Sequence, residues 1–182
     1  ELLFKKTAGR SRGWIGYTYA KTMKHIQKHG WYFPLYDRTH TLNIVGDITI
    51  SVKNNVHFST AVQASSGQPF TPPIGRYDHW QADHDPHMPA WYWDENFLVG
   101  RKNSERLPFY FRLDVGMKQK KSIFGIPYER YLQLVNVTNH VNPLTYQYKS
   151  KQNRLTGETL GLERAAVPMF PFFFTAGYRI EL

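Results

Sequence analysis

Hydrophobic and polar residues alternate one by one along much of the chain. The clearest run is residues 39–51, where the apolar positions are Leu42, Ile44, Gly46, Ile48 and Ile50. Successive side chains of a β-strand point to opposite sides, so this alternation predicts a strand with one apolar and one polar face. The helical pattern, with apolar residues at i, i+3, i+4 and i+7, has almost no support in any long window. The sequence therefore predicts an all-β protein.

We expect about seven strands, at 1–7, 13–22, 39–51, 54–67, 108–119, 126–138 and 169–182. A short Asn-containing turn joins the third and fourth, which predicts a hairpin. The sixth departs from strict alternation, because Leu132 and Leu134 have the opposite parity from Val135 and Val137. A β-bulge between these pairs would reconcile the two halves.

The intervals between these strands alternate strictly in length. Three are short (8–12, 52–53 and 120–125) and three are long (23–38, 68–107 and 139–168). Antiparallel neighbours connected in this way have all tight turns at one end of the sheet and all long loops at the other. Outer-membrane barrels have this arrangement, with short periplasmic turns and long extracellular loops. A soluble β-sandwich also alternates, but its loops have no reason to sort by length.

Composition excludes several classes of protein. The 182 residues include no cysteine, which excludes disulfides and thiolate metal or redox sites. No apolar run approaches the roughly 18 to 20 residues that a membrane-spanning helix needs. The chain starts at Glu1, without an initiator Met, inside a strand-like run, and we expect it to be a piece of a longer protein.

The chain is basic, with 23 Lys+Arg against 14 Asp+Glu and a net charge of +9. Much of this charge falls in predicted turns and loop ends, including Arg10, Arg12, Lys53, Lys120 and Lys121 in the short turns. No recognition helix or RNA-binding sheet motif accompanies it, so we expect no nucleic-acid partner. No Ser-His-Asp, paired-carboxylate or glycine-rich phosphate motif is present either, and we expect neither an enzyme nor a bound cofactor.

One long interval contains a candidate metal site, because three His and three Asp fall within residues 77–87: Asp78, His79, Asp83, His84, Asp85 and His87. Imidazole and carboxylate suit divalent metals such as zinc or nickel. The spacing fits no rigid metal motif, however, and a polar loop tip is the commoner explanation.

Aromatic residues in the same interval form a candidate substrate-binding group, consisting of Trp80, Trp91, Tyr92 and Trp93. They suit stacking on sugars or aromatic ligands, and aromatic residues also anchor barrels at the lipid interface. A soluble β-sandwich or lectin-like module that binds carbohydrate through Trp80, Trp91 and Trp93 is the alternative from another class.

The polar rows of the predicted strands contain Asp47, Arg112, Asp114, Lys118, Arg179 and Glu181. In a barrel they would line a substrate path or contact a plug, or they would form ion pairs that maintain the wall. The second interpretation is the commoner one, because the interior of such a barrel is polar in any case.

Six motifs, in this order, resemble the C-terminal barrel of the TonB-dependent outer-membrane receptors. They are Gly13-Trp14-Ile15-Gly16-Tyr17-Thr18-Tyr19; Asp37-Arg38-Thr39-His40, similar to D-R-x-H; Ser66-Gly67-Gln68-Pro69-Phe70-Thr71, similar to S-G-x-P-x-T; Arg106–Asp114, similar to R-x-P-x-Y-x-R-L-D; Leu134–Asn142, similar to V-x-N-L-x-N-x-x-N; and Pro168-Met169-Phe170-Pro171-Phe172. The resemblance covers essentially all of residues 1–182, without a plug domain, a TonB box or the earlier strands.

The resemblance implies an antiparallel transmembrane barrel segment in the bacterial outer membrane, part of an active transporter. Such receptors import siderophores, metal chelates, cobalamin, oligosaccharides or peptides by TonB-coupled energy. The implied partners are the rest of the barrel and the plug, the TonB complex through that absent plug, and outer-membrane lipid or lipopolysaccharide. Structural rather than catalytic roles are implied for Asp37, Arg38, His40, Arg112, Asp114 and Asn136.

Overall fold

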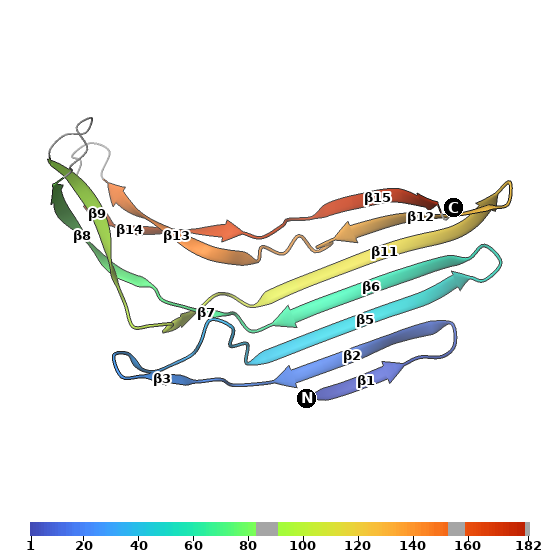
Figure 1. The fold of residues 1–182 in the computed structure, drawn as a ribbon, viewed down its shortest axis with the longest axis horizontal. Coiled ribbons are helices and arrows are strands. Elements are labelled where there is room, and N and C mark those ends of the chain that lie inside the picture. Colours follow the sequence, from blue (N-terminus) through green and yellow to red (C-terminus); the bar gives the residue numbers. More distant parts are fainter. Residues whose placement is uncertain (83–90, 153–158, 181–182) are drawn as a thin grey trace.

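The computed structural model of the chain describes residues 1–82, 91–152 and 159–180, and in these ranges it is all-β, with 68% strand and no helix. Seven strands form one antiparallel sheet in the order β1-β2-β5-β6-β11-β12-β15 (Figure 1). Their bounds are β1 Leu2–Lys6, β2 Ser11–Tyr19, β5 His40–Ser51, β6 Val56–Ser65, β11 Tyr110–Ile123, β12 Ile126–Val135 and β15 Phe173–Ile180. Each corresponds to one of the seven predicted strands. No helix in the described ranges is long and apolar enough to cross a membrane.

The seven-stranded sheet is open, because β1 and β15 form its two edges and do not pair with each other. Among the described residues, every other sheet has two strands. A two-layer sandwich is therefore not formed by this part of the chain.

The long intervals, treated as loops in the sequence analysis, contain eight further strands. These are β3 Lys24–Ile26, β4 Gly30–Tyr32, β7 Pro69–Phe70, β8 Pro73–Ala82, β9 Trp91–Val99, β10 Glu105–Arg106, β13 Pro143–Gln152 and β14 Thr159–Pro168. The two longest pairs, β8–β9 and β13–β14, are hairpins that extend beyond the sheet at its long-connection end (Figure 1). The assignment of residues 77–87 to a loop tip is thus wrong for 77–82, which lie in β8.

The predicted turn at 120–125 is also too wide. Pairing of β11 with β12 continues to Ile123 opposite Ile126, so Lys120 and Lys121 lie in a strand. The turn itself is Phe124-Gly125, with φ of 51° and 83°. Left-handed φ at both central positions is typical of a tight hairpin turn, because it matches the twist of the flanking strands. Arg12, placed in a turn by the sequence analysis, likewise lies in β2.

The parity change in the sixth predicted strand is explained at Asn136. The β11–β12 ladder is regular up to Val135, and β12 ends there. Asn136 has a left-handed φ of 52°, and the Val137 N–H then donates to the Leu113 carbonyl. If the β11–β12 register had continued, Asn136 would lie opposite Leu113. Val137 bonds to Leu113 instead, so one extra residue is accommodated after β12 rather than inside it.

The register of the sheet places the apolar rows of all seven strands on the same side. Paired residues of adjacent strands share a face, and one such row runs Phe4, Ile15, Ile44, Val62, Leu113. The neighbouring positions in each strand face the other side. Few large apolar side chains are buried in the described residues, and the buried hydrophobic residues are Ala64, Leu107 and Val135. The sheet is therefore a single layer with two exposed faces.

Candidate functional site

One face of the seven-stranded sheet, called here the apolar face, is built from the apolar parity of every strand. Besides the row named above it carries Leu2, Tyr17, Leu42, Ile48, Phe58, Val115, Met117, Leu132, Leu134, Phe174, Ala176 and Tyr178. Nothing in the described residues covers it: Phe4 is 68% exposed and Phe174 is 67% exposed. A continuous apolar surface of this extent is characteristic of an interaction surface rather than of an ordinary solvated one.

Tyrosines occupy both ends of the apolar face. At the long-connection end, the Tyr17 hydroxyl lies 2.8 Å from His40 Nδ1, and the Tyr19 ring lies 5.2 Å from the His40 ring. At the short-turn end, Tyr128 and Tyr178 share the face. Amphipathic rings at two boundaries of an apolar band are the pattern that a bilayer interface favours.

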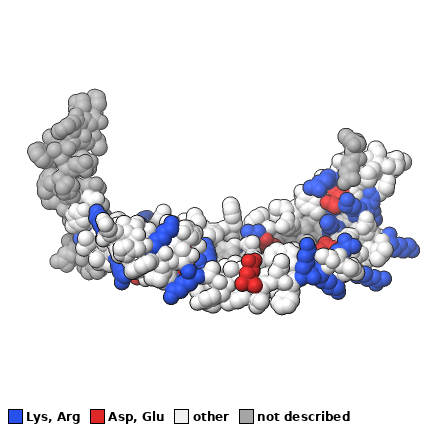
Figure 2. All heavy atoms as spheres, turned by 60° about the horizontal axis from the view of Figure 1, so that its bottom comes forward, with Lys and Arg blue, Asp and Glu red and all other residues white. Residues whose placement is uncertain are grey.

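Formal charge on the apolar face is limited to three cations. In the described strands of the sheet, Lys6, Lys121 and Arg130 are the only Lys, Arg, Asp or Glu residues with this parity. All three lie toward the short turns. Figure 2 shows many Lys and Arg at the short-turn end of the sheet, on the right, further Lys and Arg toward the left, and a mostly white stretch with an acidic group between them.

The opposite side, the polar face, carries the acidic residues of the described strands and most of their bases. Asp114 accepts hydrogen bonds from Arg112 Nε at 2.8 Å and Nη2 at 2.5 Å. Glu129 lies 3.9 Å from both Lys120 and Arg179. The predicted polar row is confirmed for Asp47, Arg112, Asp114, Lys118 and Arg179, which share this face, whereas Glu181 lies outside the described residues.

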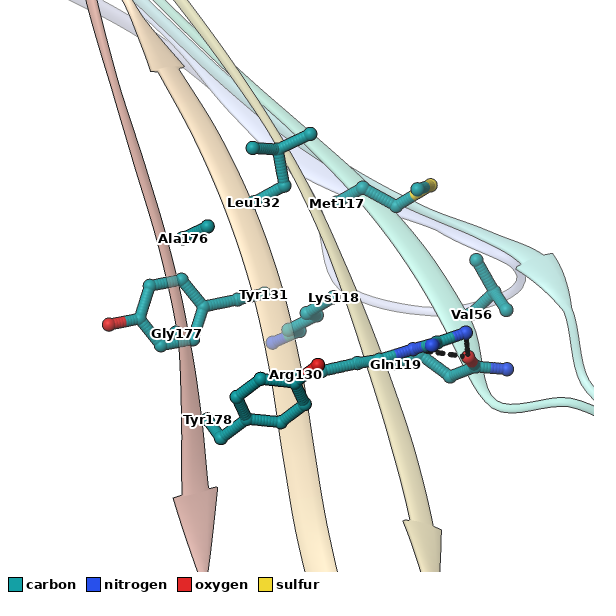
Figure 3. Close-up of a pocket in the computed structure, with 10 residues that line it drawn as sticks. All are labelled: Val56, Met117, Lys118, Gln119, Arg130, Tyr131, Leu132, Ala176, Gly177 and Tyr178. Carbon is teal, nitrogen blue, oxygen red and sulfur yellow. Dashed lines mark hydrogen bonds between the residues drawn. The ribbon is translucent and has the colours of Figure 1, made fainter.

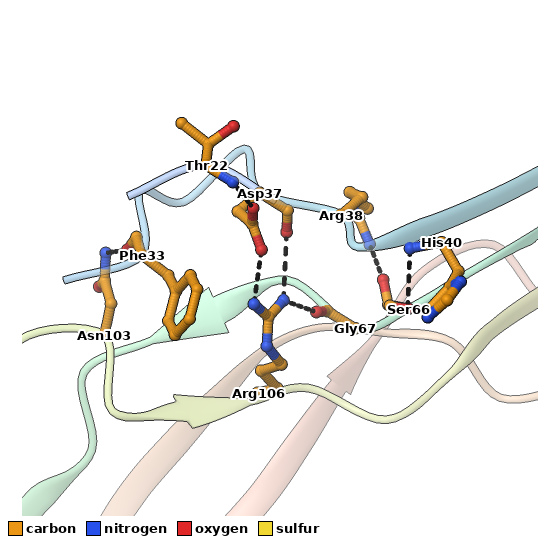
Figure 4. Close-up of polar contacts among 9 residues, drawn as sticks. All are labelled: Thr22, Phe33, Asp37, Arg38, His40, Ser66, Gly67, Asn103 and Arg106. Atoms are coloured by element: carbon orange, nitrogen blue, oxygen red, sulfur yellow. Dashed lines mark hydrogen bonds and ion pairs between the residues drawn. The ribbon is translucent and has the colours of Figure 1, made fainter. Parts of the chain in front are cut away.

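A buried ion pair anchors the long connections at one end of the sheet (Figure 4). The Asp37 side chain is 1% exposed and accepts a 2.5 Å hydrogen bond from Arg106 Nη2 and a 2.6 Å bond from the Thr22 N–H. Arg106 also donates to the Gly67 carbonyl at 3.0 Å. Burial alone would raise the pKa of the Asp37 carboxyl, but the hydrogen bonds and the Arg106 charge outweigh it and leave the pKa below its usual value.

Arg38 and His40 contact the same segment as Arg106. Arg38 donates to the Ser66 carbonyl at 3.2 Å and to Gln68 Oε1 at 3.0 Å, and the His40 N–H donates to Ser66 Oγ at 3.2 Å. Three of the motifs that are far apart in sequence therefore meet at this anchor. Asp37, Arg38 and His40 position the long connections here through these bonds.

A second polar network joins the ends of β11 and β12. The Asn136 N–H donates to Asp114 Oδ1 at 2.9 Å, and Asn136 Nδ2 donates to the His140 carbonyl at 3.1 Å. Asn142 brackets the backbone of Phe111, accepting from its N–H at 2.9 Å and donating to its carbonyl at 2.7 Å. The side chains of Asn136 and Asn142 are buried, so these bonds satisfy backbone groups that the end of the ladder leaves unpaired.

The candidate ligand-binding residues fall on the β8–β9 hairpin, for which backbone pairing alone is described at 78–82 and 91–95. Trp80 pairs with Trp93, and Gln81 with Tyr92, while Trp91 pairs with Ala82. Asp78 and His79 lie in β8, and Asp83, His84, Asp85 and His87 lie outside the described residues. No group of three or more His, Asp or Glu that could hold a metal occurs within the described ranges. The metal and stacking roles stay predictions.

Several residues of these surfaces were not among the candidates from the sequence. Arg106 and Asn142 lie inside quoted motifs, but their partners are 69 and 31 residues away. Lys6 and Arg130 could have been identified from the sequence, because each is a charged residue at a position where the alternation of its strand predicts an apolar one.

Comparison of the chain with protein-family models, with curated proteins and with solved structures gave no match.

Proposed function

We propose that the chain is a segment of the wall of a bacterial outer-membrane transport barrel, and that the whole protein is a TonB-dependent receptor that imports a scarce nutrient. The observation that carries this proposal is the apolar face: the seven neighbouring strands of the sheet direct their apolar sides to one surface, with tyrosines at both ends. Charges are confined on that surface to three cations near one end.

Dimensions agree with a membrane span. Five sheet strands have nine or more residues, namely β2, β5, β6, β11 and β12, and a transmembrane strand needs about 9 to 11. The apolar row from Leu42 to Ile50 extends roughly 27 Å along β5 at about 3.4 Å per residue. A strand tilt of about 40° reduces this to roughly 20 Å, close to the height of the apolar band on such barrels.

The two open edges of the sheet support a fragment of a larger barrel. Lipid cannot satisfy the backbone groups of β1 and β15, so a membrane-spanning sheet has to close. The remaining strands, in the same chain or another, would provide that closure. The transport assignment rests on the six motifs, several of which meet in the two polar networks that hold the bases of the long connections.

Site-specific labelling tests the membrane assignment. Residues 1–182 contain no cysteine, so only cysteines elsewhere in the whole protein would have to be replaced first. Ile44 and Val45 are adjacent, β-branched and on opposite faces. In the whole protein in vesicles, a fluorophore on Ile44→Cys should be quenched by nitroxide-labelled lipid. The same fluorophore on Val45→Cys should not be quenched by that lipid. Absence of lipid quenching at both positions, with a monomer that persists without detergent, would instead favour the soluble carbohydrate-binding module.

The transport assignment needs a separate experiment. Cells producing the whole receptor should accumulate one nutrient class, among labelled ferric siderophores, cobalamin, metal chelates, oligosaccharides and peptides. Removal of TonB or of the proton-motive force should abolish accumulation and leave binding at the cell surface. Accumulation that continues without TonB contradicts the proposal.

A further inference from the structure

The apolar face contains a shallow groove with an oriented cation at one end. The groove has a volume of about 450 Å³ and is lined on this face by Val56, Met117, Gln119, Arg130, Leu132, Ala176 and Tyr178. Figure 3 shows Met117, Leu132 and Ala176 along neighbouring strands toward one end, and Arg130, Gln119 and Tyr178 at the other. One end of the groove is therefore apolar and the other carries a guanidinium beside a phenol.

The Arg130 guanidinium is held in place by a chain of hydrogen bonds. Gln119 Nε2 donates to the Asn54 carbonyl in the β5–β6 turn at 2.9 Å. Gln119 Oε1 then accepts from Arg130 Nε at 2.9 Å and from Nη2 at 2.6 Å. Two of the five guanidinium N–H groups are used in this way, and the remaining donors stay available for an anionic acceptor such as a phosphate.

Among the described residues of the sheet, no acidic residue compensates this charge on its own face. Glu129 precedes Arg130 in β12 and therefore points to the polar face, where it lies beside Lys120 and Arg179. The other cations of the apolar face, Lys6 and Lys121, lie toward the same end of the sheet. An uncompensated, preorganised guanidinium at the border of an apolar groove matches a molecule with an anionic head and an apolar chain.

We propose that this groove binds an anionic phospholipid of the surrounding bilayer, with its phosphate on Arg130 and an acyl chain along Met117, Leu132 and Ala176. The proposal rests on the transmembrane orientation proposed above, because only then does the apolar face meet lipid. Gln119 is a positioning residue in this site, and Tyr178 borders the headgroup position.

Calorimetric titration of the whole protein in nonionic detergent tests the site. The probes are dioctanoyl phosphatidylglycerol, dioctanoyl phosphatidylcholine with the same chains, and soluble glycerol phosphate. The two lipids share the phosphate, but the choline cation of phosphatidylcholine repels Arg130 and the glycerol of phosphatidylglycerol does not. We therefore expect phosphatidylglycerol to bind about tenfold more tightly, which corresponds to about 1.4 kcal/mol. Glycerol phosphate should compete only weakly, because it has no chain for the groove.

Four variants assign the contributions. Arg130→Gln should lose about tenfold in phosphatidylglycerol affinity and most of the headgroup preference. Gln119→Ala should lose about threefold in phosphatidylglycerol affinity, because the Arg130 charge remains and only the orientation of its guanidinium is lost. Ala176→Leu, which fills the groove, should weaken both lipids equally. Arg12→Gln is the control. It removes a charge from the polar face at the same short-turn end of the sheet and should change the affinity for neither lipid.

Equal binding of the two lipids by the unmodified protein, or equal losses for Arg130→Gln and Arg12→Gln, overturns the lipid site. Glycerol phosphate that competes as strongly as phosphatidylglycerol also overturns it, in favour of a soluble phosphate ligand. Each of these results leaves the lipid quenching at Ile44→Cys intact. Loss of that quenching instead removes the transmembrane orientation and the lipid site together.

Discussion

The two faces of the seven-stranded sheet use the same strands in different ways. On the polar face, charges occur in pairs or small networks, such as Arg112 with Asp114 and Glu129 between Lys120 and Arg179. On the apolar face, acids are absent from the described strands and the three cations lie toward one end. The difference indicates that the polar face is built to satisfy charge internally, whereas the apolar face depends on its surroundings for stability.

A charge placed in the middle of the apolar face should break this comparison most severely. In the proposed membrane orientation, Ile44→Lys should destabilise the protein in vesicles by about 2 to 4 kcal/mol, because the ammonium would be desolvated near the middle of the band that would face lipid. Urea unfolding of the whole protein in vesicles gives the free energy.

Val45→Lys is the matched control, since it places the same charge one residue away on the polar face. It should cost about 1 kcal/mol or less. Equal costs for the two variants would show that the faces do not differ in their surroundings.

The polar face should be sensitive to loss of a central partner rather than to added charge. Asp114→Ala removes the acceptor of both Arg112 and the Asn136 N–H and should cost about 2 kcal/mol, measured in the same unfolding assay. Asp47→Ala provides the comparison. Its carboxylate is 37% exposed and contacts only His57, at 3.3 Å, among the described residues. We expect a change below about 1 kcal/mol there, and similar costs for the two variants would contradict a specific role for Asp114.

The strands could be predicted from the sequence because their signal is local. Alternation in residues 39–51 fixes which side chains share a side within β5, and the same holds in each sheet strand. The pairing register decides whether the apolar sides of neighbouring strands lie on the same face, as where Ile44 pairs with Ile15 and Val62. Alternation within one strand carries no information about that register. The common apolar face is therefore a finding of the structure.

Other features escaped prediction for a different reason. The β8–β9 hairpin lies in a Pro- and Trp-rich interval, and the interval of β13–β14 opens with Asn139, Asn142 and Pro143. Both compositions are typical of loops, yet cross-strand pairing over nine positions, with register shifts, makes each a strand pair. The Asp37–Arg106 pair joins residues 69 apart. The sequence offers many arginines as partners for Asp37, so only the folded chain identifies the one that is used.

Close packing on the polar face predicts a smaller effect at Gly177. A methyl group there would lie 2.7 Å from the Tyr131 hydroxyl oxygen and 2.9 Å from the ring carbon that bears it. Gly177→Ala should cost about 1 kcal/mol in unfolding free energy, because the ring has to move. In a Tyr131→Ala background the same substitution should cost nothing further. A cost that persists in the double variant would place the constraint in the backbone instead of the ring.

The smallest effect is expected at the Asp37 anchor, which lies beyond both faces and responds only to strong acid. The pKa of Asp37 is lowered in the folded protein, so its contribution is complete above the ordinary aspartate pKa near 4 and is lost as pH falls through the lower folded value. Protonation removes the negative charge of this carboxyl, which weakens its charge-assisted hydrogen bond from the Thr22 N–H. Hydrogen exchange at Thr22 should therefore lose protection below about pH 4, relative to Ala20, whose N–H donates to the Thr39 carbonyl instead. Asp37→Asn should make the ratio of the two protection factors independent of pH. Equal acid responses of Thr22 and Ala20 in the unmodified protein would mean that the whole end of the sheet opens, and that the ion pair does not hold the loop on its own.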